Sequence, residues 1–125
     1  MIKSRKARKQ RKALYNAPHH VRSAMISSHL DEPLRKEYML RSVRVVKGDT
    51  VKVMRGDEDV LGHEGKVQEV NTKTGRIIVE GVTVAKADGT EVARPIHPSK
   101  VMITRLNLTD ARRKTRLTKA KEVSQ

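Results

Sequence analysis

The charge of this chain is concentrated at its two ends, and this division limits what each part can fold into. Residues 1–42 carry 11 basic and 3 acidic side chains, residues 43–110 carry 11 and 10, and residues 111–125 carry 6 and 1. The three net charges are therefore +8, +1 and +5, within a total of +14. Only the nearly neutral middle can collapse without strong self-repulsion. We therefore expect a folded module at 43–110 between a basic N-terminal arm and a basic C-terminal tail.

The middle segment has the pattern of a small β-domain. Apolar β-branched residues recur at short intervals, as at Val51 and Val53, Val67, and Val101, and Gly, Asp, Asn and Pro separate these runs. Five or six such strands in about 65 residues predict a small antiparallel barrel, because closure removes the exposed edges of an open sheet. The fold class predicted is mainly β, with short N-terminal helices.

Helices are predicted on either side of the strands. Apolar residues at helical spacing predict one short helix from Pro18 to about Ser27, and Asp31 is placed to cap a second. After Thr109 or Asp110 we expect one basic helical turn, with fraying beyond Leu117. The first twelve residues contain seven cations and no anion, so we expect an arm that becomes ordered only on a polyanion. A solvated tail or a nuclear-import patch is the alternative interpretation of this arm.

The composition excludes several classes of protein. The chain has no Cys, which rules out disulfides, thiolate metal sites and a Cys nucleophile. No uncharged apolar stretch approaches the roughly 20 residues that cross a bilayer, and the start lacks the apolar core of a secretory signal, so we predict an intracellular, cytoplasmic protein. The five histidines form no ligand set, and no catalytic residue, metal or cofactor is predicted.

The remaining partner is a polyanion, because each Lys or Arg placed on a phosphate releases a condensed counterion. The chain has no Phe and no Trp, and its only aromatic side chains besides His are Tyr15 and Tyr38. Readers of single strands stack bases on exposed rings, so this composition favours a reader of phosphates and of RNA shape. Tyr15, within the basic arm, is a candidate for stacking on a base, whereas Tyr38 is expected to cover the core.

One motif stands out from Gly48 to Val70. It reads Gly-Asp-x-Val-x-Val, a loop with glycines at 56 and 62, and then Gly-x-Val-x-x-Val from Gly65. Glycines in such a loop provide positive φ angles or allow another backbone to approach closely. The string resembles the KOW motif. The flanking strings KALYNAP, LRKEY and IHPSKVMITRLNL are similar to those of the archaeal and eukaryotic branch of the ribosomal large-subunit protein twenty-four family.

This resemblance covers nearly the whole chain. It implies an SH3-like barrel that binds large-subunit rRNA of the 23S type, contributes to subunit assembly and lies near the peptide exit tunnel beside other ribosomal proteins and tunnel-associated factors, without membrane insertion. A transcription elongation factor or an RNA-processing enzyme is the alternative. The rRNA contacts expected from the resemblance and the basic arms are Lys3, Arg5, Lys6, Arg8, Lys9, Arg11, Lys12, Tyr15, His20, Arg22, Arg41, Arg55, Gly56, Gly62, His63, Gly65, Lys66, Lys100, Arg112, Arg113 and Lys114.

This chain departs from the family pattern between the first two glycines of the loop. Relatives usually have a shorter loop there with an aromatic residue and a Lys, whereas this chain has Asp57, Glu58 and Asp59 followed by Val60 and Leu61. Clustered carboxylates are the ligands of Mg²⁺ in nucleases, but three consecutive acids at a loop tip are more typical of a solvated turn. We expect the loop tip to face solvent or a protein partner.

Overall fold

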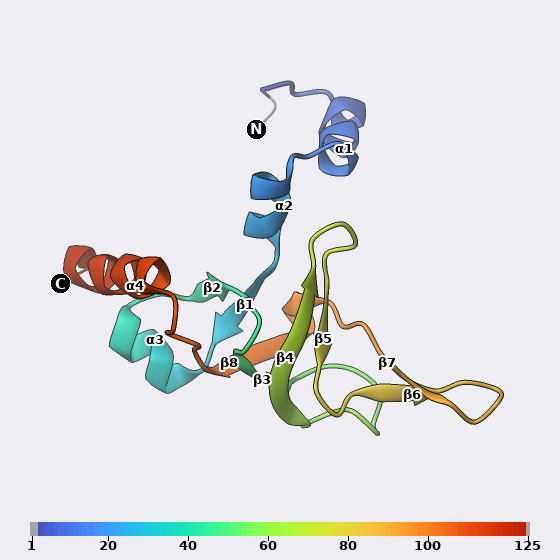
Figure 1. Cartoon of the computed structure of the whole chain (residues 1–125). Coiled ribbons are helices and arrows are strands. Elements are labelled where there is room, and N and C mark those ends of the chain that lie inside the picture. Colours follow the sequence, from blue (N-terminus) through green and yellow to red (C-terminus); the bar gives the residue numbers. More distant parts are fainter. Residues whose placement is uncertain (1–2, 125) are drawn as a thin grey trace.

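A computed structural model describes residues 3–124, which form four α-helices, a six-stranded sheet and a two-stranded hairpin (Figure 1). The helices are α1 (Ala7–Tyr15), α2 (His19–Met25), α3 (Glu32–Tyr38) and α4 (Ala111–Ser124), and a 3₁₀ turn, η1, spans Pro98–Lys100. The sheet contains β1 (Ser27–Leu30), β2 (Ser42–Arg44), β3 (Thr50–Val53), β4 (Glu64–Asn71), β5 (Arg76–Val79) and β8 (Val101–Arg105). The hairpin contains β6 (Thr83–Ala85) and β7 (Glu91–Ala93).

The sheet has the strand order β2-β1-β8-β3-β4-β5 and is mixed. The strands expected between residues 50 and 105 are confirmed, and they pair antiparallel. The sheet is not antiparallel throughout, because β1 joins it from outside the predicted module and runs parallel to β8. The sequence did not indicate β1, since its residues, Ser-Ser-His-Leu, are mostly polar. Ser28 is nevertheless fully buried, and its hydroxyl donates to the Pro98 carbonyl at 2.6 Å.

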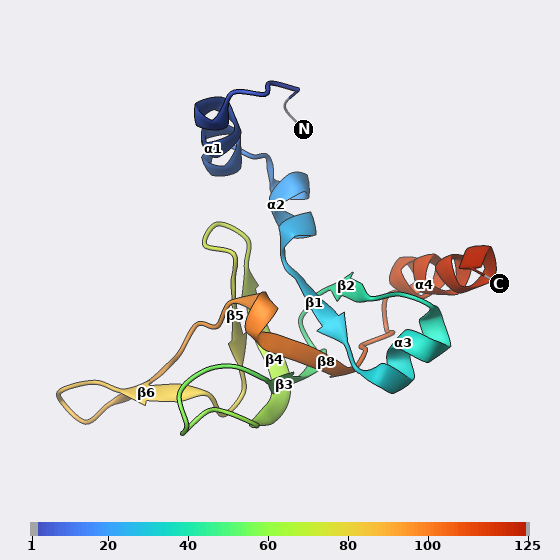
Figure 2. The same ribbon diagram turned by 180° about the vertical axis from the view of Figure 1, so that it is seen from behind.

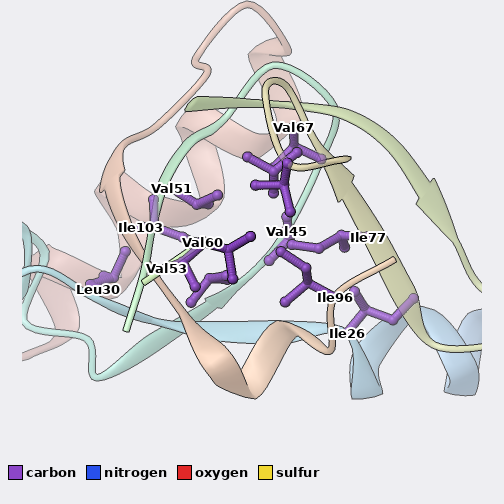
Figure 3. Packing of buried hydrophobic residues seen from close by; sticks show 13 residues of the cluster. Ile26, Leu30, Val45, Val51, Val53, Val60, Val67, Ile77, Ile96 and Ile103 are labelled. Carbon is purple, nitrogen blue, oxygen red and sulfur yellow. The ribbon is translucent and has the colours of Figure 1, made fainter. Parts of the chain in front are cut away.

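The core is small and entirely aliphatic (Figure 3). It contains 13 buried Val, Ile and Leu residues, among them Val51 and Val53 of β3 and Ile103 of β8. Five members come from outside the strands, among them Ile26, which follows α2, and Val60, which lies in the loop between β3 and β4. The acidic loop is therefore anchored to the core by its own apolar residue.

The two short helices predicted in the N-terminal segment are confirmed. Pro18 occupies the N-cap of α2, and the Asp31 carboxylate caps α3 by accepting a hydrogen bond from the Glu32 N–H at 2.8 Å. The basic arm also contains a helix, α1, which was not predicted from the sequence. It buries none of its residues and stands away from the sheet in both views (Figure 2). The contacts that would hold α1 on the folded module are therefore few.

The C-terminal helix is longer than expected. The prediction that the chain frays beyond Leu117 is wrong, because α4 continues to Ser124. The predicted fold class is also corrected: the fold is a mixture of helices and strands rather than mainly β. Two residues one turn apart, Arg113 and Leu117, are buried at 8% and 5% exposure, and they attach the helix to the rest of the fold. Asp110 supports the start of the helix, since its carboxylate accepts from the Arg112 N–H at 3.1 Å.

An ion pair between Asp49 and Arg113 joins α4 to the sheet. The Asp49 side chain is fully buried, and its two oxygens accept from the Arg113 guanidinium at 2.6 and 2.8 Å. The same carboxylate accepts from the N–H groups of Val46 and Asn107, at 3.1 and 2.8 Å. The guanidinium also donates to the carbonyls of Asn107 and Arg44, so each charged group bonds to the main chain as well as to the other.

Replacing Arg113 by Met should lower the free energy of unfolding by about 3–5 kcal/mol, because it leaves the Asp49 carboxylate buried without its cation. Urea unfolding followed by circular dichroism measures the change. Arg112→Met is the matched control, since Arg112 is the exposed neighbour on the same helix, and it should stay within about 0.5 kcal/mol of the wild type. Equal effects of the two substitutions would contradict this role of the ion pair.

Candidate nucleic-acid interface

The predicted rRNA contacts at the start of the N-terminal arm are exposed to solvent. Lys3, Arg5 and Lys6 precede α1, and the other four cations of the arm lie on it. All seven side chains are exposed, and Tyr15 at the end of α1 is 74% exposed. The helix thus presents cations and one aromatic ring to solvent, which is the combination that phosphate binding with base stacking requires.

Arg22 was predicted to contact RNA, but its side chain is bonded within the protein. Its guanidinium donates to three main-chain carbonyls, those of Tyr15, Ala17 and Lys73. The first two lie at the junction of α1 and α2, and the third lies in the turn between β4 and β5. Arg22 therefore connects the arm to the tip of the β4–β5 hairpin, which lies beside α2 in both views (Figures 1 and 2).

The three glycines of the motif have separate structural roles. Gly56 and Gly62 have positive φ angles of 151° and 81°. Gly65 lies where β4 passes β5, and a Cβ built on it would stand 2.5 Å from the Glu80 carbonyl oxygen. The close approach expected for these glycines is thus confirmed at Gly65, and the approaching backbone is the chain's own.

His63 is held by the same part of the fold. Its Nε2 lies 2.8 Å from the Glu80 carbonyl oxygen, and its ring fills the space that a side chain at residue 81 would need. A ring nitrogen that is bonded to the main chain is not free for an RNA phosphate. His63 is half-buried, so only part of its ring is open to a partner.

The remaining predicted contacts are mostly exposed. His20, Arg41, Lys66, Arg112 and Lys114 all face solvent. Arg113 does not, because its guanidinium is committed to Asp49. On α4, the exposed cations Arg116 and Lys119 stand four and seven residues after Arg112, so the three share one face of the helix. The last two were not predicted, although helical spacing from Arg112 would have identified them.

Glu58 and Asp59, at the tip of the acidic loop, are both exposed. Asp57 pairs with Arg94 at 2.5 Å, which ties the loop to the segment after β7. Among residues 3–124 no group of three His, Asp or Glu side chains is arranged to hold a metal ion. In the same range no helix has both the length and the apolar character to span a membrane.

A small cavity of about 60 Å³ lies below this loop. Four cations line it: Arg55, Arg76, Arg94 and Lys100. Two of them, Arg76 and Arg94, were not predicted from the sequence, because they are distant from the motif and only the fold brings them to it. Each stands one or two residues before a buried isoleucine, which is the only sequence signal that marks their position.

Tyr38 lies half-buried on α3 rather than in the core cluster. Burial raises the pKa of its phenol above the ordinary value, and the Glu37 carboxylate raises that pKa further, whereas the Arg113 guanidinium lowers it. The phenol of Tyr38 therefore stays neutral at physiological pH.

Comparison with known proteins decides the family. A family model that describes the L26 ribosomal proteins of eukaryotes together with their archaeal counterparts matches residues 4–120. The chain belongs to this family. It is 57% identical over 114 residues to the large ribosomal subunit protein uL24 of Methanospirillum hungatei, covering 91% of this chain and 93% of the relative. For the uL24 proteins of Methanosarcina barkeri and Saccharolobus solfataricus the identities are 57% and 50%, each over at least 93% of this chain and 98% of the relative.

Membership in the uL24 family confirms the resemblance seen in the KOW string and its flanking segments. It makes the chain a structural protein of the large ribosomal subunit rather than an enzyme. The alternatives of an elongation factor and an RNA-processing enzyme are thereby set aside. The uL24 family includes archaeal members, as expected.

Gly65→Ala should destabilise the protein by about 1–3 kcal/mol, because the new methyl group would push β4 away from the Glu80 carbonyl. Thermal unfolding measures the loss. Lys66→Ala, at the exposed next position of β4, is the control and should change stability by less than about 0.5 kcal/mol. A Gly65→Ala protein with wild-type stability but weakened RNA binding would assign the glycine to the RNA contact instead.

Proposed function

We propose that this protein binds large-subunit rRNA chiefly through phosphate contacts made by its two basic ends. The observation that carries the proposal is the presence on α1 and α4 of exposed cations that have no carboxylate partners among the described residues. Unpaired cations at this density repel one another, and a phosphate backbone relieves that repulsion. The ends would supply affinity, and the shape of the folded RNA would supply specificity.

We further propose that the central strands form the SH3-like barrel of a KOW domain. The strands β3, β4 and β5 form an antiparallel meander, and β8 returns to pair with β3. Ile77 of β5 and Ile96 exchange two main-chain hydrogen bonds of 2.9 Å, which brings the chain after the β6–β7 hairpin back to the far edge of the sheet. The segment from Ile96 to the end of β8 thus pairs with both edge strands of the meander, with β5 through Ile96 and with β3 through β8.

In the ribosome, this module would dock on folded rRNA of the 23S type while α1 and α4 lie along RNA grooves. The resemblance to the family supports a role in subunit assembly and a position near the peptide exit tunnel, beside other ribosomal proteins. Tyr15 would stack on a base, since its ring is exposed at the end of the cationic helix.

Neutralising about eight to ten phosphates should give a slope of log K against log salt of roughly −6 to −9. Filter binding to transcribed large-subunit rRNA at several salt concentrations measures it. Changing the four cations of α1, Arg8, Lys9, Arg11 and Lys12, to Gln should make the slope shallower by about 3. A wild-type slope shallower than about −3 would remove the model of two binding ends.

The acidic loop should remain apart from RNA. Glu58→Gln should leave rRNA affinity within about twofold, because an exposed carboxylate that faces solvent or a protein neither attracts nor repels a distant phosphate strongly. The same binding assay tests this. Markedly tighter binding by Glu58→Gln would show that the carboxylate lies against the RNA backbone and would contradict the expected orientation.

A further inference from the structure

The cavity below the acidic loop collects cations from four separate parts of the chain. Arg55 follows β3, Arg76 begins β5, Arg94 follows β7 and Lys100 ends η1. The floor is apolar and includes the buried side chains of Val53, Val60 and Ile96. The lining contains no acidic residue.

Main-chain hydrogen bonds hold these four positions in place. The N–H of Arg55 and that of Met54 both donate to the Lys100 carbonyl, at 3.2 and 2.8 Å. The residues beside Arg76 and Arg94 are joined in turn by the paired bonds between Ile77 and Ile96. The main chain that carries these cations is thus fixed by hydrogen bonds to the neighbouring segments, which lowers the cost of ordering the site when a ligand binds.

Three of the four charges are unsatisfied within the protein. Among residues 3–124, the side chains of Arg55, Arg76 and Lys100 have no hydrogen-bond or ion-pair partner. Arg94 has one, the Asp57 carboxylate at 2.5 Å, and it is the least exposed of the four. The site therefore holds a net excess of about three positive charges around a hollow with a low-dielectric floor, which strengthens attraction for an anion.

We propose that this cavity binds a single backbone phosphate of the rRNA, and so sets the position of the folded module on its RNA. The proposal rests on the proposed rRNA-binding function and assigns it a defined contact outside the basic ends. The volume of about 60 Å³ accommodates one phosphate group but not a nucleobase. Two arginines can grip a phosphate in a bidentate manner, and Lys100 adds a point charge.

Asp57 has a defined part in this site. By occupying Arg94, its carboxylate holds that guanidinium at the wall of the cavity and leaves the other three cations for the ligand. The acidic loop would then support the phosphate site from behind while its exposed tip faces away from the RNA.

The test uses the full-length protein and transcribed large-subunit rRNA, with affinity measured at several salt concentrations. Arg76→Gln alone should raise Kd about tenfold, because a charge-assisted contact is lost. The triple variant with Arg55, Arg76 and Lys100 changed to Gln should make the salt slope shallower by only about 1, because three cations share one phosphate. The matched control has three exposed lysines outside the cavity, Lys47, Lys73 and Lys86, changed to Gln.

The outcomes separate the inference from the function on which it rests. A cavity variant that loses more affinity than the control, with a slope change of about 1, supports the shared phosphate. A cavity variant that binds as well as the control, or a slope change of about 2–3, overturns it. Wild-type protein that fails to bind the rRNA would refute the proposed function itself. Equal thermal unfolding of the wild type and the cavity variant, whose changed side chains are exposed, confirms that folding is intact.

Discussion

The carboxylate of Asp49 organises the fold, because it accepts hydrogen bonds from its own turn and from two groups that are distant from it in sequence, at residues 107 and 113. The turn precedes β3, residue 107 follows β8, and the third donor is the guanidinium of Arg113 on α4. A core without aromatic side chains stabilises a domain of this size only modestly, so a polar contact that closes the structure matters more than it would in a larger protein. It also decides where the cations of α4 stand, since Arg113 sets the rotation of that helix about its axis.

Much of the fold was predictable because its residues obey local rules. The alternation of buried valines in β3, as at Val51 and Val53, indicates a strand that packs on one face, and Asp31 before Glu32 and Pro33 marks a helix start. The segment Ser27–Leu30 violates those rules. It is a strand only because the partner strands β2 and β8 bond to it and because Pro98 accepts from Ser28, and both β8 and Pro98 are distant in sequence.

The cationic segments of the candidate site were predicted from the sequence, but the roles of individual cations were predicted only in part. The sequence shows which segments are cationic, and the exposed cations of α1 agree with that. It does not show which cations the fold uses internally: Arg22 holds the arm to a hairpin turn, and Arg113 neutralises a buried carboxylate. Conversely, Arg76 and Arg94 lie in a segment with a net charge near zero, and only the pairing of Ile77 with Ile96 makes them neighbours. The net charge of a sequence segment therefore does not reveal cations that the fold brings together from separate parts of the chain.

The position of β8 in the sheet has a consequence for the order of events during synthesis. This strand, formed by Val101–Arg105, is the only link within the described sheet between the pair β2-β1 and the meander β3-β4-β5. Until it emerges, the two halves have no shared neighbour, although the basic helix α1 has long been available to RNA. Pairing of β8 with β1 and β3 is therefore a late step that joins residues distant in sequence, and such steps are slow. A nascent chain can thus bind its nucleic acid before its domain is complete.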